Sequence, residues 1–336
     1  MIVPSSAFVL FLTSLNTTSG EAWSTTPSEY QRYSQTLPMS TLDMAFGWTG
    51  MIPKPRIWNG PRVTYEQAPQ MYTVRALPYE LTMKLDRFRF NDDTHGIYYR
   101  LLPDMARQFK RTPDIWFRDL LTNSGTQTTG NGGLPPQFGL DGLTAFNTAH
   151  PVDLYNQTAT GPGTYSNDLT GGGQTIGGIL TGGSFGTTAF ATAIEYMGTY
   201  KAEDGESMGV EPTLLMVPNA LRLEADLVLK STFFGSPSWG TITGMVGTSD
   251  NPIKKWGIEM MVNKLLDVQS KTRWYLFDTS KAFMPLIWCE RQPATMVQRT
   301  NPTDPVNFDE HMLIWGGEGR AVPAWGPSWL FLRSGP

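Results

Sequence analysis

The residues best suited to chemistry in this 336-residue chain stand in the segment DGLTAFNTAHP at 141–151, which contains His150. A histidine changes charge near neutral pH and often serves as an acid, a base or a metal ligand. Nucleophilic catalysis also needs a nucleophile, and no serine of the chain stands in a G-x-S-x-G turn. Pro151 favours extended backbone at His150. We therefore interpret His150 as a structural hydrogen-bonding residue, Asp141 as the start of an Asp-Gly turn, and Phe146 as a core anchor.

A second set of residues has the composition of a metal site. Asp92, Asp93 and His95, joined by His150 and Asp153, would suit a hard or borderline divalent cation. The first two aspartates also stand where a helix begins, and short acidic side chains cap a helix N-terminus and favour its dipole. Capping is the favoured interpretation, so we expect no metal, no cofactor and no catalytic residue. A metal-dependent hydrolase remains an alternative.

Two further features carry no chemistry in this interpretation. Cys289 is the one cysteine and lies in the apolar run PLIWC, which predicts a buried, inert thiol. A single cysteine also excludes a disulfide within the chain and a cysteine zinc cluster. The glycine-rich run at 171–178 lacks the lysine and hydroxyl of a phosphate-binding loop, and we interpret it as a low-complexity loop.

The charge balance limits the partners. The formal net charge is −4, and the first basic residue is Arg32, so the chain has no basic arm that would condense nucleic acid. Charged residues make up 17%, below the ~25% usual for soluble domains, while aromatic residues are frequent. Interface cores have this composition, which favours burial against other copies. The apolar run at 7–15 is too short to span a bilayer and follows no basic residue, so we expect an arm packing on a neighbouring subunit rather than a secretion signal. A secreted β-rich binding module is the least favoured alternative.

The elements that would position these residues indicate an α+β architecture. Residues 1–47 are rich in Ser, Thr and Pro and suggest an extended arm. Alternating residues predict a strand over 81–85, continued to 90, and a strand at 72–76 that pairs with it as a long hairpin. Helical spacing predicts a long helix over 94–124, kinked or restarted at Pro103 and Pro113 because each proline removes a backbone donor.

The rest of the chain alternates short elements. There is no sustained βαβ repeat, which argues against a doubly wound cofactor fold. The spacing predicts helices around 190–197 and 219–230, strands at 213–217, 274–277, 285–289, 312–315 and 329–333, and a Gly- and Pro-rich loop at 233–257.

Six segments in a fixed order resemble the major head subunits of Mu-like tailed phages, members of the Hong Kong 97 capsid fold. The resemblance covers roughly residues 23–336, and no single motif decides it. The segments are FGWTGMIPKPRIWNG at 46–60, ELTMKLDRFRFNDDTHGIYY at 80–99, DGLTAFNTAHP at 141–151, the run from EYMGTYK to LVLKS at 195–231, WYLFDTSKAFMPLIWCERQPA at 274–294, and LIWGGEGRAVPAWGPSWL at 313–330.

The resemblance implies a division of the chain and a structural function. Its expected parts are an N-terminal arm at 1–47, an extended E-loop hairpin at 48–90, a P-domain with spine helix and Gly-rich insertion at 91–199, an A-domain at 200–290, and a C-terminal return to the P-domain at 291–336. It implies a non-enzymatic major capsid protein of the virion, assembled in the host cytoplasm. Pentamers and hexamers would form an icosahedral shell around double-stranded DNA, without sequence-specific contact.

The same resemblance implies separate scaffolding, portal and decoration proteins, and no membrane. An encapsulin-like nanocompartment with enzyme cargo is the alternative of the same fold. Covalent cross-linking through Lys54 or Lys84 would require a buried catalytic carboxylate, which the residues do not identify, so it is not expected.

Two groups of residues are the candidate contacts between subunits. Arg87 and Arg89 alternate with phenylalanines and would pair with carboxylates of a neighbour, while Phe88 packs beneath; in the alternative the rings are core and the arginines are solvated. Phe233, Phe234 and Trp239 lie in the loop at 233–257, which the resemblance places around the five-fold and six-fold axes.

Overall fold

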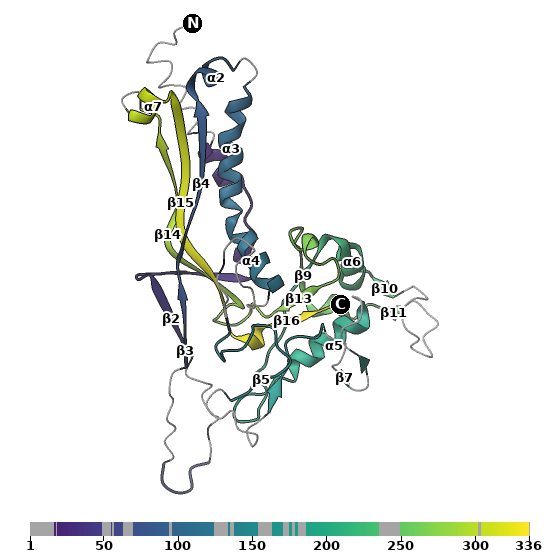
Figure 1. Ribbon diagram of the computed structural model, residues 1–336. Helices are drawn as coiled ribbons and strands as arrows, with labels where there is room; N and C mark the ends of the chain where they lie inside the picture. The colour runs from purple at the N-terminus through teal and green to yellow at the C-terminus, as the bar shows by residue number, and fades with distance from the viewer. Residues whose placement is uncertain are drawn as a thin grey trace.

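The computed structural model describes most of the chain. The described residues are 17, 19–48, 55, 57–62, 70–93, 96–123, 134, 138–153, 163–170, 175–176, 179–180, 186–234, 249–301 and 304–335. An elongated part of the molecule, built on a long sheet and a helix, joins a more compact lobe with a second sheet (Figure 1). We call this elongated part the arm; the name does not refer to the N-terminal arm expected at 1–47.

The long sheet has the strand order β1-β14-β15-β4. Its strands are β1 (Ser34–Pro38), β14 (Leu286–Arg299), β15 (Met312–Trp325) and β4 (Leu77–Asp86). β1 runs parallel to β14, and the other neighbours are antiparallel. The predicted strands at 285–289 and 312–315 are therefore the starts of two 14-residue strands. The rest of each strand is rich in polar residues and glycine, because that half of the β14–β15 pair is partly exposed.

The predicted long helix is confirmed as a restarted one. α3 (Ile97–Lys110) and α4 (Thr112–Asn123) run along the long sheet, with the break at Arg111 just before Pro113 (Figure 1). Pro103 lies inside α3 and does not end it. The helix approaches β15 closely, since a Cβ at Gly317 would lie 3.0 Å from the Phe109 ring. Glycine in the strand thus lets the helix pack on the sheet.

The hairpin pairing predicted from the sequence is wrong. β3 (Gln70–Arg75) pairs antiparallel with β2 (Asp43–Trp48), whereas β4 pairs with β15. Between β3 and β4 stands Ala76 alone, and a tight hairpin connection needs two residues or more. The chain therefore passes extended from one sheet to the other. The expected N-terminal arm is not extended throughout. Two of its segments form the strands β1 and β2, which belong to sheets, and residues 19–25 are helical.

The strand expected to reach residue 90 also ends early. Residues Arg87–Asn91 form the short helix α2, whose N-cap is Asp86. The Asp86 carboxylate accepts the N–H groups of Phe88 at 2.8 Å and Arg89 at 3.2 Å. The pairing of β15 with β4 ends at Met312, opposite Asp86, and no strand among the described residues pairs with the chain beyond this point.

The second sheet has the order β12-β9-β13-β16. Its strands are β12 (Glu259–Val262), β9 (Leu214–Val217), β13 (Trp274–Phe277) and β16 (Phe331–Ser334), with the helices α5 (Thr187–Gly198) and α6 (Arg222–Lys230) packed near it. The predicted strands and helices of this region are confirmed within a few residues. The smaller elements are η1 (Tyr30–Arg32), η2 (Asn219–Leu221), η3 (Ile253–Trp256), η4 (Leu266–Val268), η5 (Ser328–Leu330), α7 (Pro305–Asp309), β5 (His150–Pro151), β6 (Thr164–Tyr165), β7 (Thr175–Ile176), β8 (Ile179–Leu180), β10 (Phe233–Phe234) and β11 (Ser249–Asp250).

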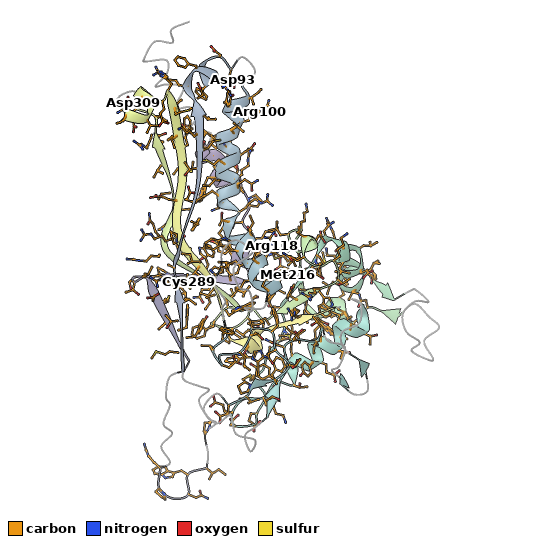
Figure 2. The ribbon with its side chains drawn as sticks, in the orientation of Figure 1. Asp93, Arg100, Arg118, Met216, Cys289 and Asp309 are labelled. Carbon is orange, nitrogen blue, oxygen red and sulfur yellow. The ribbon has the colours of Figure 1, made fainter. Side chains whose placement is uncertain are left out.

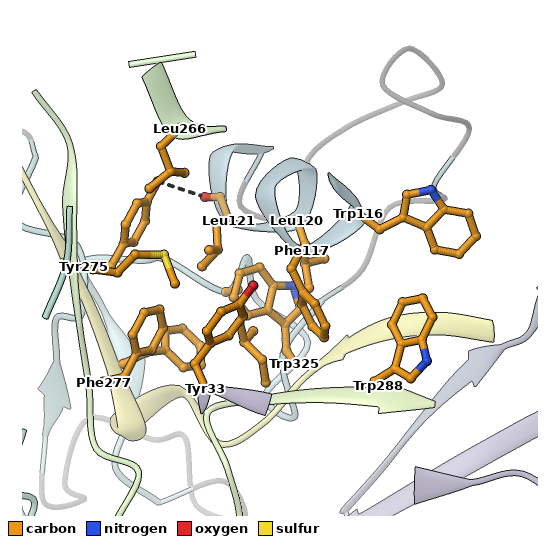
Figure 3. Packing of buried hydrophobic residues seen from close by; sticks show 14 of the residues in the cluster. Tyr33, Trp116, Phe117, Leu120, Leu121, Leu266, Tyr275, Phe277, Trp288 and Trp325 are labelled. Carbon is orange, nitrogen blue, oxygen red and sulfur yellow. Dashed lines mark hydrogen bonds between the residues drawn. The ribbon is translucent and has the colours of Figure 1, made fainter. Parts of the chain in front are cut away.

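An aromatic core fills the junction between the arm and the lobe. It takes side chains from α4, from both sheets and from the segment before β1, so that one apolar cluster joins all of them (Figure 3). Phe117 meets the Tyr33 ring edge-on at 5.6 Å, and Tyr33 stacks on Phe277 at 6.0 Å. Burial of such rings is a large favourable term in folding, and it fixes the arm relative to the lobe.

Candidate assembly surfaces and the motif around His150

The motif at 141–151 forms a turn that carries a buried histidine. Gly142 has a positive φ of 74°, and the Asp141 Oδ1 atom accepts the Leu143 N–H at 3.1 Å, as expected for an Asp-Gly turn. The other carboxylate oxygen of Asp141 lies 2.5 Å from Nδ1 of His150. The His150 side chain is fully buried, and the Asp141 side chain is 3% exposed. The predicted structural roles of Asp141 and His150 are consistent with this geometry.

Two residues from other segments complete the surroundings of the ring. Asn167 Oδ1 lies 3.1 Å from His150 Nε2, and the carbonyl oxygen of Ala145 lies 3.2 Å from the same atom. The Tyr165 ring stacks on the imidazole at 5.4 Å, and its hydroxyl is 2.6 Å from Ser328 Oγ. We name Asp141, His150, Tyr165, Asn167 and Ser328 the His150 network. Asn167 and Ser328 were missed from the sequence, where nothing distinguishes them from loop residues.

Phe146 connects this motif to the core, as predicted. It is 3% exposed and meets Trp325 and Phe331 edge-on at 5.5 and 5.2 Å. The Arg333 guanidinium lies 4.6 Å from the centre of the same ring and pairs with Asp168 at 2.5 Å. Burial disfavours the charged form of Asp168 and acts to raise its pKa. The hydrogen bonds and the positive charge of Arg333 outweigh burial, so the pKa of this carboxyl lies below its ordinary value.

The described side chains do not assemble a catalytic centre around His150. Burial raises the pKa of Tyr165 above its ordinary value, so its hydroxyl stays protonated. Cys289 is buried in β14, and burial raises the pKa of its thiol to about 12, as expected for an inert thiol. Asp93, which lies near α2 in Figure 2, is far from Cys289 in the middle of the sheet.

The metal alternative gains no support from the geometry. Asp93 Oδ2 accepts the Tyr98 N–H at 2.8 Å in the first turn of α3, which is the predicted capping role. The start of α3 and β5, which contains His150, lie at opposite ends of the molecule (Figure 1). His95 is outside the described residues, and within them no group of three His, Cys, Asp or Glu side chains is placed to hold a metal ion.

The α2 end of the arm presents one of the predicted contacts. Phe88 is 57% exposed and lies beside His311, with ring centres 4.9 Å apart. Phe90 is buried against Trp315 at 6.2 Å, and Arg89 is exposed. The two phenylalanines therefore have different environments, and the reason is the helical turn that replaces the expected strand. Whether Arg87, Phe88 and Arg89 contact another subunit stays a prediction.

The β2–β3 hairpin lies near the other end of the long sheet from α2 (Figure 1). Phe46 and Tyr72 stack across it at 5.2 Å. Within the connection, Ile57 is 85% and Trp58 is 71% exposed, and the Trp58 Nε1–H donates to the Gly60 carbonyl at 2.7 Å. We call residues 57–62 the hairpin tip. Lys54 lies outside the described residues, and Lys84 pairs with Glu310 at 2.5 Å.

The lobe contains the other predicted contact residues and an exposed apolar pair. Phe233 and Phe234 form the strand β10, which pairs with β11, while Trp239 lies outside the described residues. On α6, Leu223 is 71% exposed and Leu227 follows one turn later on the same exposed face. This apolar pair was missed from the sequence, although its four-residue spacing opposite the buried side of α6 would have indicated it.

Comparison with solved structures defines the fold as that of a phage capsid subunit, the Hong Kong 97-like fold. A chain of the bacteriophage JBD30 procapsid is 21% identical with a TM-score of 0.53, over 99% of this chain and 76% of that one. The capsid structure of cyanophage P-SCSP1u is 11% identical with a TM-score of 0.52, over 93% of this chain and 89% of that one.

The chain belongs to the family of the Mu-like prophage major head subunit gpT, whose model matches residues 9–177 and 248–331. It is 29% identical over 126 residues to the major capsid protein of Escherichia phage Mu, an alignment that covers 38% of either chain. The part aligned thus spans well under half the length of that relative. In the described part of the chain, no helix has the length and apolar character needed to cross a bilayer.

Proposed function

We propose that this chain is the major capsid protein of a tailed bacteriophage. Copies of it form pentamers and hexamers, which build an icosahedral shell around double-stranded DNA. Its membership of the gpT family and its capsid fold support this proposal. The family consists of phage head subunits, so an encapsulin-like nanocompartment is not favoured. The division into arm, E-loop, P-domain and A-domain expected from the resemblance is part of the proposal.

The observation that carries the proposal is the projecting β2–β3 hairpin. A hairpin of two strands is marginally stable in water without further packing. The tip exposes Ile57 and Trp58, although burying large apolar side chains is more favourable than leaving them in contact with water. A neighbouring subunit beneath the hairpin would bury both residues. The hairpin therefore has the properties of an assembly element rather than those of a catalytic scaffold.

Other contacts would add to this one. We propose that Arg87, Phe88 and Arg89 contact a neighbour at the α2 end of the arm, and that Phe233, Phe234 and Trp239 contribute around the five-fold and six-fold axes. Each contact can be weak, because a subunit in a closed shell holds several neighbours and the contacts act together.

The remaining partners follow from the proposed shell. A net charge of −4 suits a container that is filled and emptied, since a lysine-rich interior would bind the genome tightly. The DNA is enclosed without sequence-specific contact. Scaffolding, portal and decoration functions belong to separate proteins, assembly takes place in the host cytoplasm, and the product is the virion shell.

Substitution at the hairpin tip tests the proposal. Replacing Ile57 and Trp58 together by serine is expected to reduce the yield of large particles in sedimentation by at least tenfold, while the free subunit keeps its thermal unfolding temperature. Val268→Ser is the matched control, because Val268 is 76% exposed on η4, away from the tip. An unchanged particle yield in the double variant would contradict the assembly role of the tip.

A further inference from the structure

We propose that the buried His150 ring is held as an imidazolium against the Asp141 carboxylate, and that this pair forms a proton-dependent clamp. The clamp joins residues 138–153 and 163–170 to the C-terminal segment at 328–334. The proposal does not depend on the capsid function.

The atoms around the ring establish the number of protons. Nδ1 faces the Asp141 carboxylate at 2.5 Å, and Nε2 faces Asn167 Oδ1 at 3.1 Å and the Ala145 carbonyl at 3.2 Å. All three of these oxygens are hydrogen-bond acceptors. A neutral imidazole carries one N–H and one lone pair, so beside an ionised Asp141 one of its nitrogens would direct a lone pair at an acceptor. With a proton on both nitrogens, every contact becomes a hydrogen bond.

The orientation of the Asn167 amide, on which this count depends, is determined by three backbone groups. Its NH₂ group donates to the carbonyls of Ala145 at 2.7 Å and Ser328 at 3.0 Å, and its Oδ1 accepts the Asn147 N–H at 2.8 Å. If the amide were turned over, two carbonyls would face an oxygen and one N–H would face an NH₂ group. Asn167 therefore presents an acceptor to His150.

Asp141 supplies the balancing charge. Its Oδ1 atom accepts the Leu143 N–H at 3.1 Å, which favours the ionised carboxylate. A buried charge is costly unless it is paired, and Asp141 and His150 satisfy this requirement for each other. The other titratable groups nearby are already engaged: Tyr165 stacks on the ring and bonds Ser328, and Arg333 pairs with Asp168.

The network bridges segments that are far apart in the sequence. Through the Asn167 NH₂ group, which donates to the Ser328 carbonyl at 3.0 Å, it ties residues 163–170 to η5, and β16 continues the connection, because the Arg333 N–H donates to the Asn167 carbonyl at 2.8 Å. Loss of the proton from His150 would leave a buried lone pair facing oxygen and a carboxylate without its counter-charge.

Nitrogen NMR of the full chain with labelled histidine tests the protonation state. The chain has three histidines, and His150→Gln assigns the signal of His150. We expect both nitrogens of His150 to be protonated in the folded chain. Free subunits and sedimented particles both permit this measurement. An unprotonated nitrogen on His150 in the folded chain would overturn the proposal, whatever the assembly state.

Asp141→Asn tests the clamp itself. An asparagine NH₂ can donate to Nδ1, so a neutral His150 would have every partner satisfied. In this variant we expect one nitrogen of His150 to be unprotonated, whereas His311→Gln, the matched control, leaves both nitrogens of His150 protonated. Two protonated nitrogens on His150 in Asp141→Asn would refute the clamp. If the variant does not fold, the NMR measurement on the wild type decides.

Discussion

Replacing Asp114 by asparagine is expected to stabilise the subunit at neutral pH. Asp114 lies in the first turn of α4, is 9% exposed, and has one carboxylate oxygen without a hydrogen-bond partner among the described residues. Burial raises the pKa of Asp114 to about 6, although the backbone N–H groups of Tyr30 and Glu29 oppose the shift. The fold therefore favours the protonated carboxyl.

The magnitude and sign of the effect follow from this pKa. The difference between about 6 and the ordinary value of 3.8 corresponds to about 3 kcal/mol of preference for the neutral form. Because the folded-state pKa is raised, Asp114 contributes relative stability below pH 4 and loses it as pH rises through 6. Asparagine is neutral at every pH, so Asp114→Asn is expected to gain up to about 3 kcal/mol at pH 7 and less than about 1 kcal/mol at pH 4.

Urea unfolding of the unassembled subunit at several pH values between 4 and 8 measures this gain. The midpoint should move without a change in the slope of the free energy against urea, because the surface exposed on unfolding stays the same. Asp104→Asn is the control, since the Asp104 side chain is 61% exposed on α3. Parallel pH profiles for wild type and Asp114→Asn, or a loss of stability in the variant at pH 7, would refute the reasoning.

Two further predictions concern the core. Phe146→Ala should destabilise the subunit by about 3–5 kcal/mol in urea unfolding, because it leaves a cavity among buried rings; a loss below about 1 kcal/mol would contradict its role as an anchor. The Cys289 thiol should react with a thiol reagent at the rate of unfolding, and fast labelling of the folded chain would contradict its burial.

The sequence predicted elements well where burial on both faces leaves a continuous apolar run. The runs predicted as strands at 274–277 and 213–217 correspond to β13 and β9, since all the side chains of these two strands are buried. Local sequence patterns could not predict the strand pairing, because the partner of β3 is β2, which lies more than twenty residues upstream. At Arg87–Phe90 two local signals conflicted, and the Asp86 cap prevailed over alternation once β15 offered no further partner.

The candidate site shows the same division between local and distant information. Asp141 and His150 stand nine residues apart in one motif, so their turn and structural character were predictable. Asn167 and Ser328 approach the ring from segments that pair through the tertiary fold, and no spacing rule connects them. The exposed contacts are still less predictable, because the exposure of Phe88 and the burial of Phe90 depend on a single helical turn.

Electron microscopy of the purified protein tests the central proposal most directly. The account predicts closed shells with five-fold and six-fold clusters of subunits, in which the hairpin tip of one subunit is covered by another. A discrete small oligomer, or a monomer with the tip exposed at the concentrations that capsid assembly requires, would contradict it.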